Sequence, residues 1–266
     1  MFDKIINNMS KAAEDKKTTD YVDEATGLVH CGICHSPKQM QVPCKELNNP
    51  IVWIACDCKK AEWEKEKAKQ AKEEEIARYA RLKAQCFKGK ERDFTFETDD
   101  TPSSKQSKLL REWADNFTLS CKDWILLYGG CGGGKSFYAA ALCNAVLSKG
   151  LPAKFTSISE VERQLWECEC KQAVYDDIAR VALLVLDDFG AERNSEYMQE
   201  VVFNVIDSRS RAGKATVITT NLSPVEIINP PSLNIQRVMS RICENLIPVE
   251  VNHADRRIEA LKNRIK

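Results

Sequence analysis

Residues 124–136 read WILLYGGCGGGKS, and this stretch decides the fold. Its first five residues form a continuous apolar run, which predicts a buried strand. The following residues are rich in glycine. Residues 137–147 are rich in alanine and other apolar residues, and Gly150 follows them, which predicts a helix with a glycine end. The stretch therefore predicts a strand, a tight turn and a helix N-terminus in direct succession.

The turn at residues 129–136 fits the phosphate-binding pattern G-x-x-x-x-G-K-[S/T]. Glycines let backbone N–H groups converge on an anion, and the helix N-terminus adds partial positive charge. We expect Lys135 to reach the β- and γ-phosphates of ATP, and the Ser136 hydroxyl to bind Mg²⁺. A glycine turn with a chance lysine is the alternative, which the flanking strand and helix disfavour. The expected nucleotide-binding residues are Gly130, Cys131, Gly132, Gly133, Gly134, Lys135, Ser136 and Phe137.

The composition excludes a globally basic nucleic-acid-binding protein. Among 266 residues, Lys+Arg and Asp+Glu each total 39, so the formal net charge is zero and any DNA contact must be local. No apolar stretch approaches the ~20 residues that span a bilayer. Residues 1–17 lack the apolar core of a signal peptide. We therefore expect a cytoplasmic protein with no membrane segment.

A second strand ends in acidic residues. Residues 181–188 read VALLVLDD, an apolar run that places Asp187 and Asp188 at its C-terminal end. Strands of this kind lie in the centre of parallel sheets and present carboxylates at the sheet edge. This acidic strand end follows the phosphate loop by about fifty residues. We therefore expect Asp187 to hold Mg²⁺ and Asp188 to polarise the attacking water.

A polar residue follows a third strand. Residues 215–219 form an apolar strand candidate, and Asn221 comes shortly after it. At that sheet edge, the Asn221 side chain would lie beside the γ-phosphate and sense its state. The alternative is a helix cap or a turn residue.

Strands and helices alternate along residues 93–266, which predicts a doubly wound α/β fold with a parallel sheet of about five strands. Further strands are predicted at residues 153–158 and 247–251. Helices are predicted at residues 105–117, from residue 159 to about 180, at 195–212 and at 232–245.

Twelve cysteines are present, and five of them lie within residues 31–58. Cys31 and Cys34 form a C-x-x-C pair, and Cys56 and Cys58 form a tighter C-x-C pair. Four thiolates at this spacing can complete a tetrahedral Zn²⁺ site, without which so small a segment could hardly fold. The residue types leave His35 or Cys44 open as one ligand. Unligated thiols or a redox C-x-x-C pair are the alternatives.

Residues 59–90 are rich in Lys, Glu, Ala, Gln and Arg without a broad apolar stripe. This composition predicts a solvated helix that spaces two modules. The predicted domains are a zinc module at residues 1–58, a charged helical linker at 59–92 and a nucleotide-binding domain at 93–266.

Four motifs together resemble the DnaC/DnaI-type helicase loaders and the related IstB-type transposition ATPases of the AAA+ superfamily. They are GGCGGGKS (129–136), LDDFGAER (186–193), ITTNL (218–222) and RVMSRI (237–242). The resemblance covers roughly residues 94–257 and implies an AAA+ domain without the usual C-terminal helical lid. The N-terminal part resembles the zinc module of DnaI-like loaders, including phage-encoded versions. That likeness implies contact with a replicative hexameric helicase.

The resemblance also implies residue roles. Lys135 and Ser136 match the Walker A motif, and Asp187 and Asp188 match the Walker B motif. Asn221 matches the sensor 1 residue. Arg241 matches the arginine finger, with Arg237 beside it, and Arg257 matches the sensor 2 arginine, for which Arg256 is the alternative. An arginine finger acts on a neighbour's nucleotide, so the match implies a homo-oligomer that assembles with ATP. The alternative for Arg237 and Arg241 is a solvated helix face.

The leading hypothesis is an ATP-dependent loader of a replicative helicase onto single-stranded DNA during replication initiation. The alternatives are a transposition ATPase acting on duplex DNA, and a nucleotide-gated adaptor with little turnover. Asp188 stands where glutamate is common, which implies slow hydrolysis. The basic residues Arg209, Arg211 and Lys214 are candidates for contact with a DNA backbone, or cations that stabilise a helix C-terminus.

Overall fold

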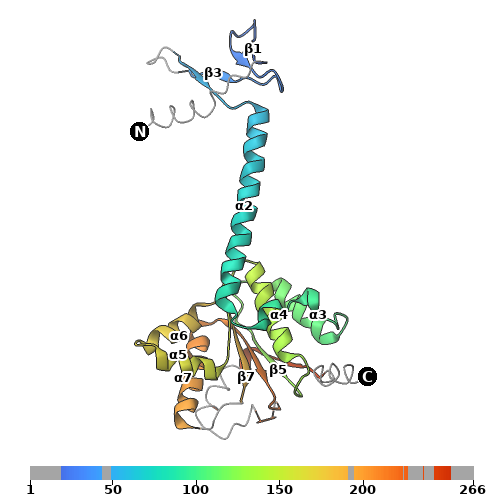
Figure 1. Ribbon diagram of the computed structural model, residues 1–266, viewed down its shortest axis with the longest axis vertical. Helices are drawn as coiled ribbons and strands as arrows, with labels where there is room; N and C mark the ends of the chain where they lie inside the picture. Colours follow the sequence, from blue (N-terminus) through green and yellow to red (C-terminus); the bar gives the residue numbers. More distant parts are fainter. Residues whose placement is uncertain are drawn as a thin grey trace. The chain divides into compact units, whose positions relative to one another are not determined.

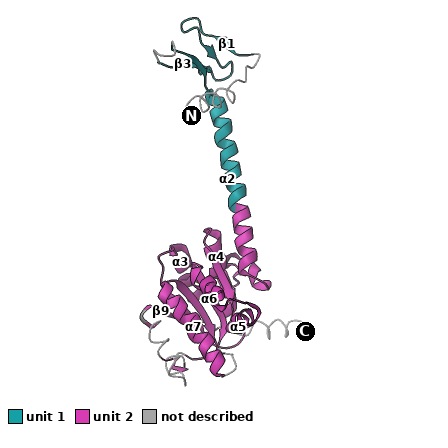
Figure 2. Cartoon of the chain, turned by 90° about the vertical axis from the view of Figure 1, so that its left-hand side faces the viewer, with its two compact units in different colours: residues 1–75 teal, residues 76–266 magenta. Residues whose placement is uncertain are grey.

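The computed structural model describes residues 19–43, 49–190, 195–223, 225–226, 236 and 243–252. The chain divides into two compact units, residues 1–75 and 76–266, which Figure 2 colours separately. The division falls inside the segment predicted as a linker. The predicted domain boundaries, after residues 58 and 92, remain predictions from the sequence.

A five-stranded parallel sheet organises the larger unit (Figure 1). Its strands lie in the order β6-β7-β8-β5-β9, and each neighbouring pair is parallel. The strands are β5 (Trp124–Tyr128), β6 (Ala153–Thr156), β7 (Leu183–Phe189), β8 (Ala215–Thr220) and β9 (Leu246–Glu250). This arrangement confirms the predicted α/β fold. Because β7, β8 and β5 are neighbours, the segments that follow them emerge side by side at one edge of the sheet.

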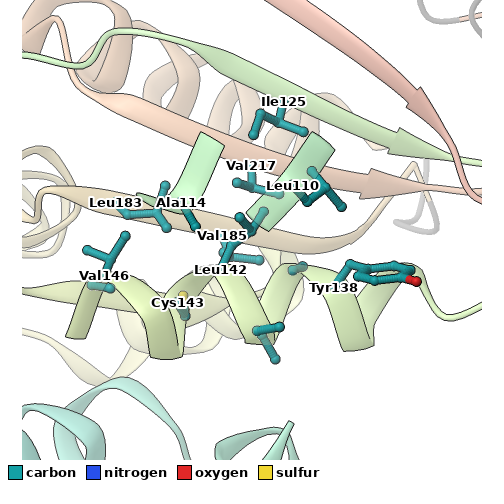
Figure 3. Packing of buried hydrophobic residues seen from close by; sticks show 14 of the residues in the cluster. Leu110, Ala114, Ile125, Tyr138, Leu142, Cys143, Val146, Leu183, Val185 and Val217 are labelled. Atoms are coloured by element: carbon teal, nitrogen blue, oxygen red, sulfur yellow. The ribbon is translucent and has the colours of Figure 1, made fainter. Parts of the chain in front are cut away.

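Alternate side chains of the central strands enter two separate hydrophobic cores, because successive residues of a strand point to opposite faces. Ile125 and Leu127 belong to one core, and Trp124 and Leu126 belong to the other. The first core packs against α3 (Lys105–Asn116) and α4 (Lys135–Ser148), as Figure 3 shows from close by. The second packs against α5 (Ile158–Glu167), α6 (Lys171–Arg180) and α7 (Glu196–Ala212). Helices therefore cover both faces of the sheet.

Some strands and helices begin or end at other residues than predicted, because local caps and turns set their ends. Strand β6 stops at Thr156 rather than at residue 158, because Ser157 caps α5 and its side chain accepts a hydrogen bond from Glu160 N at 3.2 Å. The helical stretch predicted to run to residue 180 is two helices with a break at residues 168–170. Helix α4 begins at Lys135, directly after Gly134, whose φ of 97° favours glycine.

Helix α2 (Asp57–Cys86) extends over most of the predicted linker. Its last turns are not fully solvated as predicted, because Tyr79 and Leu82 are partly buried against the first core and Cys86 belongs to it. These three residues are spaced three and four apart, which is a short apolar stripe confined to the end of the helix. Two 3₁₀ turns follow, η2 (Lys90–Asp93) and η3 (Phe96–Thr98).

The described residues of the smaller unit form two short antiparallel hairpins. Strand β1 (Tyr21–Val22) pairs with β2 (Val29–His30), and β3 (Gln39–Gln41) pairs with β4 (Ile51–Trp53). Within its described residues, the buried side chains include an ion pair between Lys38 and Asp20 at 2.7 Å. Hairpins of two and three residues bury too little apolar surface to be stable by themselves, so a cross-link is needed.

The structure contradicts the proposed contact of Arg209 with DNA. Arg209 is fully buried, and its guanidinium donates to Thr216 Oγ1 (3.1 Å) and to main-chain carbonyls. The carbonyl acceptors are those of Ile178, Ala179, Val181 and Ala215. Burial lowers the pKa of Arg209 to about 9, so the side chain remains a cation at neutral pH. It secures the C-terminal end of α6 to α7 and β8, where helical carbonyls lack intrahelical donors.

Several predicted features lie outside the described residues. They are Cys44, Arg237, Arg241, Arg256, Arg257, most of the helix predicted at 232–245, and the chain after residue 252. Among the described helices, none combines the length and apolar character needed to cross a membrane.

Candidate functional site

A cavity of about 550 Å³ lies where the phosphate-binding loop meets the strand ends. It brings together the loop, the start of α4 and the polar residues after β7 and β8. Its lining residues are Lys90, Glu91, Phe94, Cys131, Gly132, Gly133, Gly134, Lys135, Ser136, Phe137, Asp187, Asp188 and Asn221. The structure therefore places every described residue of the predicted nucleotide site at one cavity except Gly130, whose carbonyl contacts Lys135.

The loop leaves β5 through a conformation that needs glycine. Gly129 has φ 139°, and a Cβ atom there would lie 2.5 Å from the carbonyl oxygen of Val251. Any side chain at this position would push the loop away from the end of β9. The glycine therefore allows the loop to turn back over the sheet edge toward α4.

Lys135 is held at the inner end of the cavity. Its Nζ donates to the carbonyls of Gly129 (3.0 Å) and Gly130 (2.7 Å) and to Asn221 Oδ1 (2.8 Å). Burial lowers the pKa of Lys135, while nearby Cys131 and the two aspartates oppose that shift. The cation is thus surrounded by neutral oxygens that a phosphate oxygen can replace.

Asp187 and Asp188 lie at the end of β7 in a network that the sequence did not reveal. Thr219 Oγ1 donates to Asp187 Oδ1 at 2.6 Å and accepts from the Asp188 backbone N–H at 2.9 Å. Burial is the main reason that the pKa of Asp187 is raised, and hydrogen bonds from Thr219 and Ser136 oppose it. The Ser136 hydroxyl and the Asp187 carboxylate are therefore neighbours, as a shared Mg²⁺ requires.

Asp188 has a left-handed backbone with φ 55°, which few non-glycine residues adopt. The pairing of β7 with β8 shifts register between Leu186 and Phe189, around this residue. The bulge and the Thr219 hydrogen bond turn Asp188 into the cavity rather than along the strand. Thr219 was signalled only by its place in the strand-end motif, two residues before Asn221.

One wall of the cavity comes from η2, in the segment predicted to end the linker. Lys90, Glu91 and Phe94 line it, and the Phe94 ring lies 5.5 Å from the Phe137 ring, centroid to centroid. The buried side chain of Asn144 in α4 donates to Phe94 O at 2.8 Å and fixes this wall. Nothing in the sequence of η2 signalled a site.

The four predicted zinc ligands converge in the smaller unit. The Sγ atoms of Cys31, Cys34, Cys56 and Cys58 all lie within 4.8 Å of one another. The Sγ–Sγ distances are 3.6 Å between Cys31 and Cys58 and 3.2 Å between Cys56 and Cys58. Tetrahedral Zn–S bonds of ~2.3 Å place sulfurs about 3.8 Å apart, so the cluster fits Zn²⁺. His35 is not in it, because its ring lies beside Tyr21, with Nδ1 3.4 Å from the Tyr21 hydroxyl.

Local hydrogen bonds hold the two cysteine pairs together. Ser36 Oγ accepts from the Asp57 N–H at 2.9 Å, and it lies 3.2 Å from Cys34 Sγ. The hydrogen bond with Ser36 is the largest cause that lowers the pKa of Cys34 to about 5. The turn after the first pair is closed by a bond from His35 N to Cys31 O at 2.9 Å. The environment therefore favours a thiolate at Cys34, which is the form that zinc binds, whereas hydrogen bonds with Cys56 and Cys31 raise the pKa of Cys58 to about 12.

Outside both sites, an aromatic platform lies on the α5–α6–α7 face. Trp166 is 73% exposed, and its ring lies 5.7 Å from that of Tyr197. Lys171 Nζ lies 5.9 Å from the Tyr197 ring. Trp166 and Tyr197 are 31 positions apart, so no local sequence pattern reveals this platform of Trp166, Tyr197 and Lys171.

Comparison with known proteins supports the nucleotide site. The model of a family described as IstB-like ATP binding protein matches residues 60–227. The replicative helicase loader DnaC of Escherichia coli (strain K12) is 26% identical over 137 residues, which are 50% of this chain and 54% of that protein. The replicative helicase loader DnaI of Bacillus subtilis (strain 168) is 27% identical over 146 residues, which are 50% of this chain and 47% of that protein.

A putative ATP-binding protein in an insertion sequence of Mycobacterium tuberculosis is 27% identical over 159 residues, with 58% of this chain and 62% of that protein covered. The chain thus spans about half the length of the curated loaders it matches. A crystal structure of DnaI covers 66% of this chain with a TM-score of 0.56 and 21% identity, and 99% of that chain is matched. A crystal structure of the DnaC helicase loader matches with a TM-score of 0.54 and 24% identity. The match covers 62% of this chain and 99% of that chain. The fold is therefore shared with these structures.

Proposed function

Because the chain belongs to the IstB-like ATP binding protein family, we propose that it is an ATPase that loads a replicative DNA helicase onto single-stranded DNA during replication initiation. One observation carries the proposal: loop amides, Lys135, two aspartates and Asn221 meet at one cavity. The names of the relatives DnaC and DnaI support the loader role.

In the proposed ATP complex, the phosphates lie against the backbone amides of residues 131–136. Lys135 exchanges Asn221 Oδ1 and the loop carbonyls for phosphate oxygens, and Asn221 is then available beside the γ-phosphate. Ser136 and Asp187 would hold Mg²⁺, which supplies positive charge to the polyphosphate. Binding of ATP thereby changes the contacts of the strand-end residues.

For hydrolysis, we assign Asp188 to orient the attacking water, because its backbone is held in the cavity by Thr219. Its side chain is one methylene shorter than glutamate, which favours slow turnover suited to a switch. Arg241 and Arg237 are proposed to act on the nucleotide of a neighbouring copy, and Arg257 on its own. Hydrolysis then depends on ATP-dependent assembly.

Replacement of Lys135 tests the nucleotide site. Lys135→Ala is expected to weaken ATP binding about 100-fold, because charge-assisted hydrogen bonds to phosphate contribute about 3 kcal/mol. Isothermal titration calorimetry of the full chain with Mg-ATP measures the effect. Lys108→Ala, at an exposed position of α3, is the control and should bind as the parent does. Equal affinity of the Lys135 variant and the parent would remove the nucleotide site from this loop.

The aromatic platform supports a role in single-strand binding. Exposed aromatic rings beside a cation are what unpaired bases stack on. Trp166→Ala is expected to weaken binding of a fluorescent oligothymidine about tenfold, because stacking contributes about 1–3 kcal/mol per base. Trp63→Ala, another exposed tryptophan, should leave the affinity unchanged. If both variants bind equally, the DNA contact lies elsewhere.

Exposed apolar side chains of the smaller unit support a protein partner. Tyr21, Val22, Ile33, Met40 and Ile51 are all exposed although apolar. We propose that this unit, with zinc bound, contacts the helicase. Co-purification of the full chain with a hexameric replicative helicase is the expected result. The relative in an insertion sequence favours a second candidate, a transposition ATPase, for which a transposase and duplex DNA would be captured instead.

A further inference from the structure

The cavity wall formed by η2 offers two different side chains to a ligand. Glu91 lies in η2, and Phe94 directly follows this turn as its C-cap, with the Phe94 N–H donating to Glu91 O at 3.1 Å. Both are partly buried, and both line the same cavity as the phosphate-binding loop. A residue with a carboxylate and one with an aromatic ring therefore line this cavity from outside the loop and the strand ends.

This wall is held in place by α4. The Asn144 side chain, 3% exposed, donates to Phe94 O at 2.8 Å and to Arg92 O at 3.3 Å. The Phe94 ring packs against Phe137, which directly follows Ser136. The position of η2 is thus set by the same helix whose N-terminus receives the phosphates.

The loop amides and the strand-end carboxylates occupy the phosphate and magnesium side of the cavity. The remaining described lining is that of η2 and Phe94, so we place the sugar and the base against it. Glu91 lies close enough to Asp187 to contribute to the raised pKa of that carboxyl, which puts Glu91 at the boundary between the two sides. The rings of Phe94 and Phe137 provide an apolar surface for a base. Among the described residues, no donor or cation pairs with the Glu91 carboxylate. Beside a polyphosphate such a charge is repulsive, whereas hydroxyl groups of the sugar are donors that satisfy it.

We propose that Glu91 recognises the ribose of the bound nucleotide by accepting hydrogen bonds from its 2′- and 3′-hydroxyls. This inference rests on the ATP binding proposed above and adds a specificity-determining residue to that site. It explains why a carboxylate is placed in a pocket whose ligand is itself an anion. The site then selects ribonucleoside triphosphates over analogues without sugar hydroxyls.

The experiment compares Mg-ATP with its 2′,3′-dideoxy analogue by calorimetry on the full chain. The parent is expected to bind ATP about tenfold more tightly, as hydrogen bonds to a charged group imply. Glu91→Ala should bind ATP about tenfold more weakly and the dideoxy analogue unchanged, so that the preference disappears. Glu91→Gln, which keeps one acceptor oxygen, should retain part of it.

Asp93→Asn is the matched control, because Asp93 lies in the same turn, and its side chain is 76% exposed beside Arg92. It should keep the preference of the parent. Equal weakening of both ligands by Glu91→Ala would overturn the proposal, and so would restoration of ATP binding by excess Mg²⁺, which would assign Glu91 to the metal. Binding of inorganic tripolyphosphate distinguishes failure of the ribose proposal from failure of the proposed nucleotide site. The parent should bind tripolyphosphate, and Lys135→Ala should bind it more weakly. If tripolyphosphate does not bind, or if Lys135→Ala binds it as the parent does, the proposed nucleotide site itself is wrong.

Discussion

Removal of metal from the four-cysteine site is expected to unfold residues 19–75 while the larger unit stays folded. The hairpins of this unit are two and three residues long and bury little apolar surface. Structural zinc contributes about 10 kcal/mol or more to such small folds, which is more than their other interactions supply. Both Cys34→Ser and treatment of the parent with a chelator should therefore unfold residues 19–75.

Zinc content and limited proteolysis measure this prediction. The parent is expected to bind one zinc ion per chain, and the Cys34→Ser chain should lose it. Proteases should then cleave within residues 19–75 at least tenfold faster, while ATP affinity is retained. Cys170→Ser, at an exposed thiol outside the cluster, is the control. A zinc-free parent with the same resistance to proteolysis as the variant would show that the thiols serve no structural metal.

Arg209→Ala is expected to destabilise the larger unit by about 4 kcal/mol. The guanidinium is fully buried and satisfies carbonyls at the end of α6 and the start of β8. Its removal leaves these acceptors unpaired and opens a cavity, and each effect costs a few kcal/mol. Chemical denaturation, followed by tryptophan fluorescence, to which the buried Trp124 contributes, measures the change in the free energy of unfolding.

Arg211→Ala is the control that separates the effect of removing a buried side chain from the effect of removing a positive charge. Arg211 lies two residues further along α7, is 77% exposed and pairs with Asp207 at 2.7 Å. The Asp207 side chain is only 10% exposed but has a further interaction, and the Arg211 guanidinium lies in solvent, so the control should lose only about 1 kcal/mol, much less than Arg209→Ala. If the two variants are equally stable, the buried hydrogen bonds of Arg209 contribute nothing net. A loss of DNA binding by Arg209→Ala at unchanged stability would restore its predicted role.

The two cysteine pairs and the phosphate loop were predicted because each depends on short spacing. Cys31 and Cys34, or the residues of the loop, meet whenever the local turn forms. The helical stretch predicted to run to about residue 180 does end at Arg180, but its break at residues 168–170 was missed because it carries no glycine or proline. The DNA contact considered for Arg209 was wrong because a basic residue near a helix end is usually exposed, and only packing of α6 and β8 against α7 buries it.

Local chemistry was enough to predict the parallel α/β fold, the phosphate loop, the acidic strand end and the four thiols, because apolar runs, glycine turns and ligand spacing act over a few residues. Long-range packing alone placed Thr219 between the two aspartates, Glu91 and Phe94 in the cavity wall, and Trp166 beside Tyr197. Each of these groups meets its partner from a different element. Their meeting depends on strand order and helix docking, which no pattern of neighbouring residues encodes.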